Sequence, residues 1–323
     1  MARPLVLYVT GWCRSGTTVI GNLLNEVDGV VHVGELRYLW VNGVLGHGTN
    51  STCGCGSPVL ACPLWRDVLH RVVGPGADLP TVARHWVELQ ARLVRTRHTI
   101  SRLAGGVRRA TPPGDVRELA ALTTELYGAI AEAAGARVVV DSSKFPAEAA
   151  LLVGSTDLDV RVLHVVRDPR ATAHSWARPK AYIPAMGPAR STLYWTGFNA
   201  ASELVAARRR DRSARVRYED FVRDPRGVLA GVLRLADLDV EPPVDADGSA
   251  WLGVNHTVTG NPDRLRRGPL RIRPDDRWQA ELPGGATATA TAFALPLLHR
   301  YGYPLWPART PAGAASAVPE EVA

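Results

Sequence analysis

The chain has 323 residues, with 38 Lys or Arg against 31 Asp or Glu, and its formal net charge of +7 is too small to favour a nucleic-acid binder and suits a small polyanionic ligand. No run reaches the roughly 18 consecutive apolar residues that a membrane span requires. The apolar run at the N-terminus is too short for a signal peptide, so we expect a cytoplasmic protein without a membrane span.

Strand-like and helical patterns alternate along the chain. Three apolar, strand-like runs are each followed by a helical pattern, and a weaker strand comes later. The strands are expected at 4–10, 137–141, 160–166 and 214–218, and the helices at 17–27, 146–154 and 169–178. This alternation predicts βα units on a central parallel sheet that is flanked by helices, an α/β fold.

Two further helical regions and a tail complete the predicted organisation. Apolar residues at helical spacing predict a helical insertion at about 79–135, between the early and the late sheet elements. Another helix at 190–210 ends in the basic run Arg208–Arg210, which is typical of a solvated last turn. The Ala-, Pro- and Glu-rich tail at 307–323 is expected to be disordered, which leaves 1–306 as a single domain.

The glycine-rich turn from Gly11 to Thr18 joins the first strand to the first helix. Its spacing Gly11-x4-Gly16 matches the nucleotide-binding loop G-x-x-x-x-G-K-[ST], whose backbone N–H groups hold an anion at a helix N-terminus. Thr17 stands where an NTPase has its lysine, and Arg14 supplies positive charge instead. We therefore expect a phosphate-bearing donor other than ATP.

A second anion site is predicted where the strand at 160–166 ends. Arg167 would lie at the carboxyl end of a parallel strand, where open α/β sheets bind ligands, and Ser175 follows about two helical turns later. A second phosphate could be bound there. The alternative is that Arg167 and Asp168 form a pair that only caps the start of the next helix.

The two segments together resemble the PAPS-dependent sulfotransferases, where PAPS is 3′-phosphoadenosine 5′-phosphosulfate. Those enzymes bind the 5′-phosphosulfate with an R-S-G-T-T type loop and the 3′-phosphate with an R-D-P-R…S motif. The chain is most similar to a bacterial branch with motifs like those of tyrosylprotein sulfotransferases. The further motifs of that branch, which extend the resemblance over residues 5–280, are Gly34-Glu35, Asp141–Pro146, Arg217–Phe221, Gly260–Arg264 and Asp276-x-Trp278.

The resemblance implies a P-loop-type fold and an in-line transfer of a sulfuryl group from PAPS to a hydroxyl acceptor, with release of PAP and no metal required. Glu35 matches the general base, and Lys144 matches the lysine that neutralises the leaving oxygen, a cationic role shared with Arg14. Lys144 is also one of only two lysines in the chain, so a lysine here calls for a reason. His32, in the strand-like run 30–33, is the alternative base.

The resemblance also assigns residues to the donor. The 5′-phosphosulfate would be bound by Arg14, Ser15, Gly16, Thr17 and Thr18. The 3′-phosphate would be bound by Arg167 and Ser175, with Tyr218 and Arg264 as further nucleotide contacts. The Asn-, Thr-, Gly- and Pro-containing loop 255–264 is suited to close over the nucleotide.

The acceptor and the catalytic competence are left open by the sequence. A small-molecule or glycan hydroxyl is the first expectation and a protein tyrosine the second, with the acceptor walls formed by 36–135 and 179–195. The aromatic residues that could contact an acceptor are Trp40, Trp176, Tyr182, Tyr194 and Trp195. A P-loop kinase or NTPase and an inactive PAP-binding module are the alternative functions, and the oligomeric state is open.

Three cysteines fall in one Gly- and Pro-containing segment, as Cys53-x-Cys55-x6-Cys62. Three interpretations are open: free thiols, a Cys55–Cys62 disulfide, or a zinc site with His47 as a fourth ligand. Cys13, in the anion loop, is assigned no role.

Overall fold

A computed structural model of the protein describes residues 3–48, 50–107, 114–179 and 183–306. The strands are β1 (Leu5–Thr10), β2 (Val30–Gly34), β3 (Val138–Lys144), β4 (Asp159–Val166), β5 (Ser213–Arg217), β6 (Ser249–Leu252) and β7 (Gly268–Arg271). The α-helices are α1 (Thr17–Leu24), α2 (Pro63–Val73), α3 (Leu79–Leu93), α4 (Thr99–Val107), α5 (Gly114–Ala134), α6 (Pro146–Leu152), α7 (Pro169–Ala177), α8 (Pro188–Arg208), α9 (Tyr218–Arg223), α10 (Pro225–Leu235), α11 (Trp278–Glu281) and α12 (Gly284–Arg300). Short 3-10 or π-helical turns cover Leu36–Tyr38, Leu39–Val44, Val59–Ala61, Thr96–His98, Arg210–Arg212 and Pro262–Leu265.

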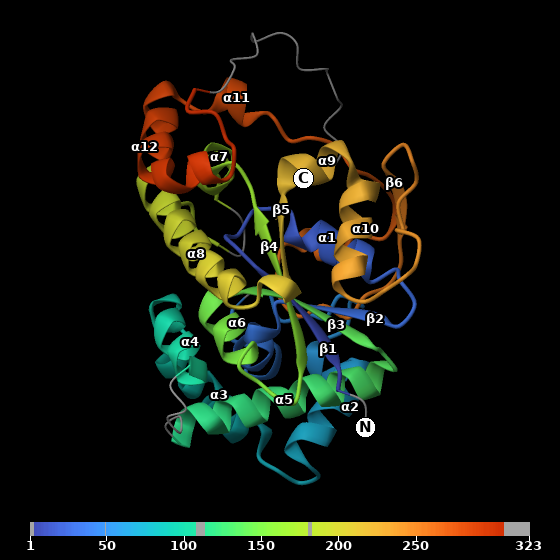
Figure 1. Ribbon diagram of the computed structural model, residues 1–323. Helices are drawn as coiled ribbons and strands as arrows, with labels where there is room; N and C mark the ends of the chain where they lie inside the picture. The colour runs from blue at the N-terminus through green and yellow to red at the C-terminus, as the bar shows by residue number, and fades with distance from the viewer. Residues whose placement is uncertain (1–2, 49, 108–113, 180–182, 307–323) are drawn as a thin grey trace.

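The centre of the molecule is a five-stranded parallel sheet in the order β2-β3-β1-β4-β5 (Figure 1). The middle strand, β1, is buried along its whole length, and its Leu7 lies opposite Val140 of β3 and Arg161 of β4. Strands covered on both faces read as continuous apolar runs, which explains why the sequence shows β1 so clearly. The predicted α/β fold is confirmed.

Alternate residues of β1 enter two separate cores. Leu7 packs with Ile20 of α1 and Leu229 of α10, so these helices cover one face of the sheet. Tyr8 belongs to the opposite core, together with Ile130 of α5 and Ala147 of α6. This alternation follows from the two-residue period of a strand and places a helical layer on each face.

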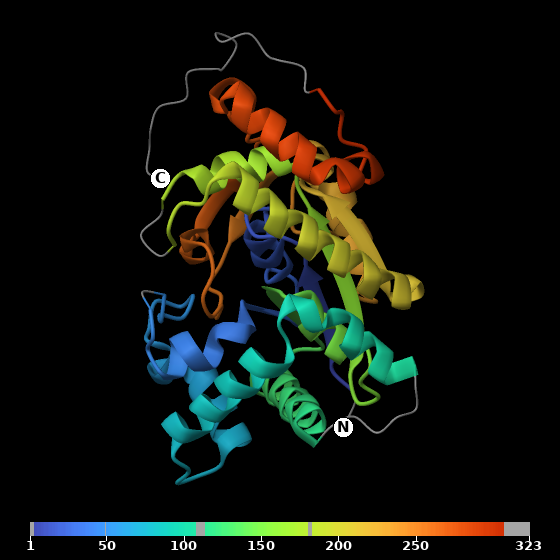
Figure 2. The same cartoon turned by 90° about the vertical axis from the view of Figure 1, so that its left-hand side faces the viewer.

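Helices gather at the two ends of the molecule. Figure 2 shows α2 to α5 at one end and α7, α8 and α12 at the other. The predicted insertion contains α3, α4 and α5, with the break between α3 and α4 at the Thr96–His98 turn. Helix α2 was not predicted, although Pro63 in its first turn and the buried Trp65 and Leu69, four residues apart, are a helix signal. Among the described residues, no helix is both long and apolar enough to cross a bilayer.

An aromatic core holds the end of β4 beside the anion loop. The indole of Trp12 stacks on Trp176 of α7 at 5.6 Å and meets Phe198 of α8 at 4.8 Å. Trp195 of α8 donates from its indole N–H to the carbonyl oxygen of Arg167 at 3.0 Å. Both the loop and Arg167 are therefore fixed by packing of α7 and α8.

The tail at 307–323 lies outside the described residues.

Candidate active site

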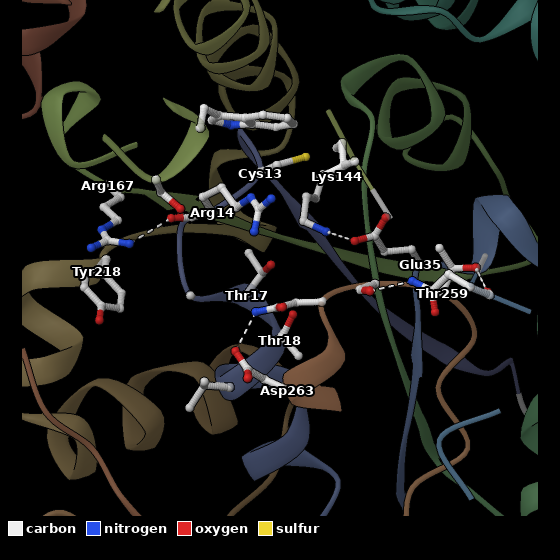
Figure 3. A pocket seen from close by; sticks show the side chains of 18 of the residues that line it. Cys13, Arg14, Thr17, Thr18, Glu35, Lys144, Arg167, Tyr218, Thr259 and Asp263 are labelled. Atoms are coloured by element: carbon white, nitrogen blue, oxygen red, sulfur yellow. Dashed lines mark hydrogen bonds and ion pairs between the residues drawn. The ribbon is translucent and has the colours of Figure 1, made fainter. Parts of the chain in front are cut away.

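The carboxyl ends of the central strands open onto a cavity of about 570 Å³ (Figure 3). Its lining combines the loop after β1, residues at the ends of β2, β3 and β4, the last turn of α7, the start of α9, and the segments at 259–263 and 275–277. The cavity brings together most of the predicted site residues, namely Arg14, Gly16, Thr17, Thr18, Glu35, Lys144, Arg167, Ser175 and Tyr218. This position matches the rule that open α/β sheets bind ligands at the carboxyl ends of their strands.

The anion loop depends on two glycines with left-handed backbones. Gly11 has φ +125°, and a Cβ there would lie 2.2 Å from the carbonyl oxygen of Val165. Gly16 has φ +80° and precedes α1, where a Cβ would lie 2.6 Å from the ring of Tyr218. Only glycine fits such positions. The loop therefore turns tightly and presents the N-terminus of α1 to the cavity, an arrangement that binds anions.

Two predicted donor contacts do not line the cavity. The Ser15 hydroxyl is buried and donates to the carbonyl oxygen of Trp12 at 2.8 Å, so it stabilises the loop from inside. The guanidinium of Arg264 is also buried and donates to the carbonyl oxygens of Thr257 and Thr52 at 3.0 and 2.8 Å. These bonds hold the loop 255–264 in place, which corrects the expectation that the two side chains face the donor.

The most notable contact in the cavity is an ion pair between Lys144 and Glu35. Lys144 ends β3 and Glu35 directly follows the neighbouring β2, and Nζ of Lys144 lies 2.6 Å from Oε1 of Glu35. The ammonium also donates to the carbonyl oxygen of Ser142 at 2.9 Å. Lys144 adopts a left-handed backbone with φ +77°, rare for a residue with a side chain. Figure 3 shows the Lys144 side chain directed at Glu35.

Burial determines the electrostatics of this pair. The side chains of Lys144 and Glu35 are only 5% and 18% exposed. Burial opposes the charge of the ammonium, but the carboxylate of Glu35 outweighs it, and the pKa of Lys144 is raised above its ordinary value. A cation is thus held next to a carboxylate at the edge of an anion-binding loop.

Arg167 sits at the end of β4 and connects three parts of the site. Its guanidinium donates to the carbonyl oxygen of Arg14 at 3.2 Å and to the carboxylate of Asp275 at 3.0 Å. It also stacks over the ring of Tyr218 at 4.4 Å. Within the described chain its buried Nε has no hydrogen-bond partner.

The alternative for Arg167, a pair with Asp168 at the helix start, is not what the structure shows. Asp168 accepts from the backbone N–H of Arg170 at 2.8 Å and pairs with the Arg170 guanidinium at 2.6 Å. Asp168 therefore caps α7 with Arg170 as its partner. Arg167 is left to face the cavity.

His32 is buried in the core and does not line the cavity. Its ring nitrogens lie 3.0 Å from the hydroxyl of Ser142 and 3.3 Å from the side-chain oxygen of Asn22. Burial, reinforced by the charge of Lys144, lowers the pKa of His32 to about 3. The imidazole is neutral and already hydrogen-bonded, so of the two candidate bases only Glu35 reaches the cavity.

Some lining residues escaped the sequence analysis, above all Asp275 and Arg277. Arg277 donates to the Asp275 carboxylate at 2.9 Å, on the opposite side from Arg167. The pKa of Asp275 is lowered because the hydrogen bonds from Arg277 and Arg167 overcome the effect of its burial. The motif Asp276-x-Trp278, which the analysis did single out, lies beside these two residues and is the signal that could have found them.

Most of the aromatic residues expected to contact the acceptor do not line the cavity. Trp176 lines the cavity. Trp40 stacks on Trp86 in one core, and Trp195 is packed in another. Tyr194 stacks on Trp12 at 5.4 Å, and Tyr182 lies outside the described residues. Of the described residues in this set, Trp176 alone faces the cavity, and it also carries the guanidinium of Arg14 on its ring at 5.1 Å.

Solved structures of sulfotransferases match most of this chain at low sequence identity. No curated protein is significantly similar in sequence. The sulfotransferase domain from the Synechococcus PCC 7002 olefin synthase is 18% identical, with 95% of this chain and 98% of that chain covered and a TM-score of 0.45. The sulfotransferase domain from the curacin biosynthetic pathway is 15% identical, with 94% and 100% covered and a TM-score of 0.50, a likeness of fold. The sulfotransferase STF9 from Mycobacterium avium is 16% identical, with 94% and 77% covered and a TM-score of 0.46.

The sequence profile of the Sulfotransferase family matches residues 6–242, which include the anion loop, Glu35, Lys144, Arg167 and Tyr218. This match spans more than half of the chain. The protein therefore belongs to the sulfotransferase family.

Proposed function

We propose that the protein transfers a sulfuryl group from PAPS to a hydroxyl acceptor and releases PAP. The observation that carries this proposal is the buried Lys144–Glu35 pair at the edge of a cavity that the anion loop also lines. Sulfuryl transfer needs a base for the acceptor proton and positive charge on the leaving phosphate oxygen. The pair supplies both groups within one contact.

The donor would be held by two anion sites. The backbone N–H groups of the loop, the side chains of Thr17 and Thr18, and Arg14 would bind the 5′-phosphosulfate at the N-terminus of α1. Arg167 and Ser175 would bind the 3′-phosphate, with the ring of Tyr218 beside them. Asp275 holds the guanidinium groups of Arg167 and Arg277 in place, so this part of the site is organised before a ligand arrives.

The proposed chemistry follows from the N–H donor that Lys144 leaves unused and from the ability of the Glu35 carboxylate to accept a proton. An ammonium has three N–H donors, and Lys144 uses two of them on Glu35 and the carbonyl oxygen of Ser142. The third would stabilise the oxygen that bridges sulfur and phosphorus as it becomes anionic. Glu35 would take the proton of the acceptor hydroxyl while the new oxygen–sulfur bond forms and the bond from sulfur to the phosphate oxygen breaks. The electron pair of the broken bond stays on PAP.

The acceptor we propose is the hydroxyl of a small molecule or a glycan. The cavity volume of about 570 Å³ falls in the range of small-molecule sites, and part of it must hold the donor. Trp176 and Tyr38, both in the lining, offer aromatic surface on which a sugar or phenol ring could pack.

The direct test is transfer of labelled sulfate from PAPS across a panel of carbohydrates, phenols and peptides. We expect labelled product from a small-molecule or carbohydrate acceptor. Thermal shift measurements with PAP and with ATP form the control, and PAP is expected to stabilise the protein more than ATP does. Stabilisation by ATP alone would support a phosphotransferase instead, and PAP binding without transfer to any acceptor would support an inactive binding module.

A further inference from the structure

We propose that Cys53, Cys55, Cys62 and His256 bind one zinc ion, which fastens a wall of the cavity to the rest of the fold. The three sulfur atoms and one imidazole nitrogen all lie within 4.8 Å of one another. None of these residues lines the cavity. The proposed site is therefore structural and separate from the sulfuryl-transfer chemistry.

The backbone brings the three cysteines together in a tight turn. The backbone N–H of Cys53 donates to the carbonyl oxygen of Ser57 at 2.8 Å, and the N–H of Gly56 donates to the carbonyl oxygen of Cys53 at 2.9 Å. Gly56 has φ +94°, which lets the chain reverse. Cys62 stands immediately before α2 and its carbonyl oxygen begins that helix. This turn directs the three thiols to a common point.

The fourth ligand comes from far along the chain. Nδ1 of His256 lies 3.2 Å from the sulfur of Cys62 and 3.7 Å from that of Cys53. The carbonyl oxygen of His256 accepts from the indole N–H of Trp65 at 2.8 Å, which fixes its backbone against α2. His47, the ligand considered from the sequence, is exposed and is not a member of the cluster.

The spacing suits a tetrahedral metal better than the other interpretations. With Zn–S bonds of about 2.3 Å, the sulfurs of a tetrahedral site lie about 3.8 Å apart, so small side-chain shifts would complete the shell. All four cysteines of the chain are free thiols rather than disulfide partners. Three thiolates and one imidazole form a common structural zinc set.

The position of the cluster explains what the metal would do. Directly after His256, the carbonyl oxygen of Thr257 accepts from the N–H of Gly54 at 2.9 Å. The N–H of the next residue, Val258, donates to the carbonyl oxygen of Val33 at 2.8 Å. Its carbonyl oxygen accepts from the N–H of Glu35 at 2.9 Å. A metal at His256 would therefore hold the strand-like segment that pairs with the end of β2, from which Glu35 projects.

The test begins with the metal content of the purified wild-type protein. We expect about one zinc per chain by elemental analysis. Replacement by Co²⁺ should produce the intense visible absorption of a tetrahedral thiolate site. Zinc removal by a chelator should lower the melting temperature. These measurements require neither PAPS nor an acceptor, so they test the zinc site independently of the proposed activity.

Variants locate the ligands. Cys55 is the most exposed of the cluster cysteines. The variants Cys55→Ser and His256→Gln should each lose most of the zinc and the cobalt spectrum. Cys13→Ser is the matched control, since Cys13 lies outside the cluster, and it should keep both. The proposal is overturned if wild-type protein purified without chelator carries no zinc and takes up no cobalt, or if Cys55→Ser and His256→Gln retain full metal content.

Discussion

Breaking the Lys144–Glu35 pair from each side, and then from both, separates catalysis from stability. Lys144→Met keeps an unbranched side chain of nearly the same length but removes the charge. Glu35→Gln keeps the shape of the carboxylate but removes its negative charge and its ability to take a proton. The double variant removes both charges and leaves no buried ion without a partner.

The expected cost of each single change can be worked from the geometry. Two unit charges 2.6 Å apart attract by about 6 kcal/mol at an effective dielectric constant near 20. Desolvation offsets much of this, and removing one partner of a buried pair typically costs about 3–5 kcal/mol. We expect each single variant to lose about 3 kcal/mol of unfolding free energy. The double variant should recover most of that loss, because neutral replacements of a buried pair are well tolerated.

Turnover is expected to behave differently from stability. Lys144→Met should lower kcat by at least about a hundredfold, which corresponds to about 2.7 kcal/mol of transition-state stabilisation. Glu35→Gln should abolish measurable turnover while sparing PAP affinity. The double variant should be stable yet inactive, since neither the base nor the ammonium is present.

The assays are urea denaturation for stability, calorimetric titration with PAP for affinity, and sulfate transfer from PAPS for kcat. Lys144→Arg is the matched control for charge, since it keeps the cation but replaces the compact ammonium by a planar group. Transfer at the wild-type rate by Lys144→Met would refute the role of Lys144, transfer by Glu35→Gln would refute that of Glu35, and transfer by the double variant would refute both.

Three further outcomes follow from the same site. Arg167→Ala should weaken PAP binding by about 10- to 100-fold, as expected for a lost charged hydrogen bond, while adenosine 5′-phosphate, which lacks the 3′-phosphate, should bind equally well before and after the change; equal losses for both ligands in calorimetry would contradict the assignment. Gly16→Ala should abolish PAP-induced thermal stabilisation, because its Cβ would lie 2.6 Å from the ring of Tyr218 at a φ of +80°, and retained stabilisation would show that the loop can adapt. His32 has a folded-state pKa of about 3, below its unfolded value of about 6.5, so its contribution to stability is present above pH 6.5 and is lost as the pH falls towards 3. His32→Gln should therefore flatten the dependence of unfolding free energy on pH in this window, and an unchanged slope in denaturation series would argue against the buried neutral imidazole.

The sequence by itself determined the order of the βα units and the place of the anion loop. These signals are local: a fully covered strand such as β1 must be apolar throughout, and the tight turn before α1 requires Gly11 and Gly16 at their spacing. The segment from β4 into α7 was equally legible, because Pro169 marks the first turn of the helix. Such patterns place Arg14 in the loop after one strand and Arg167 directly after another without knowledge of the rest of the chain.

Only the tertiary structure decided which side chains meet. Glu35 and Lys144 are more than a hundred residues apart, and their contact depends on β2 and β3 being neighbours in the sheet. The structure also sorted the candidates by their hydrogen bonds, since the polar atoms of His32, Ser15 and Arg264 bond to other groups of the fold and these residues do not line the cavity. The cysteine turn was visible in the sequence, whereas its partner His256 was not, because side-chain contacts between distant segments arise from packing and leave no periodic pattern along the chain.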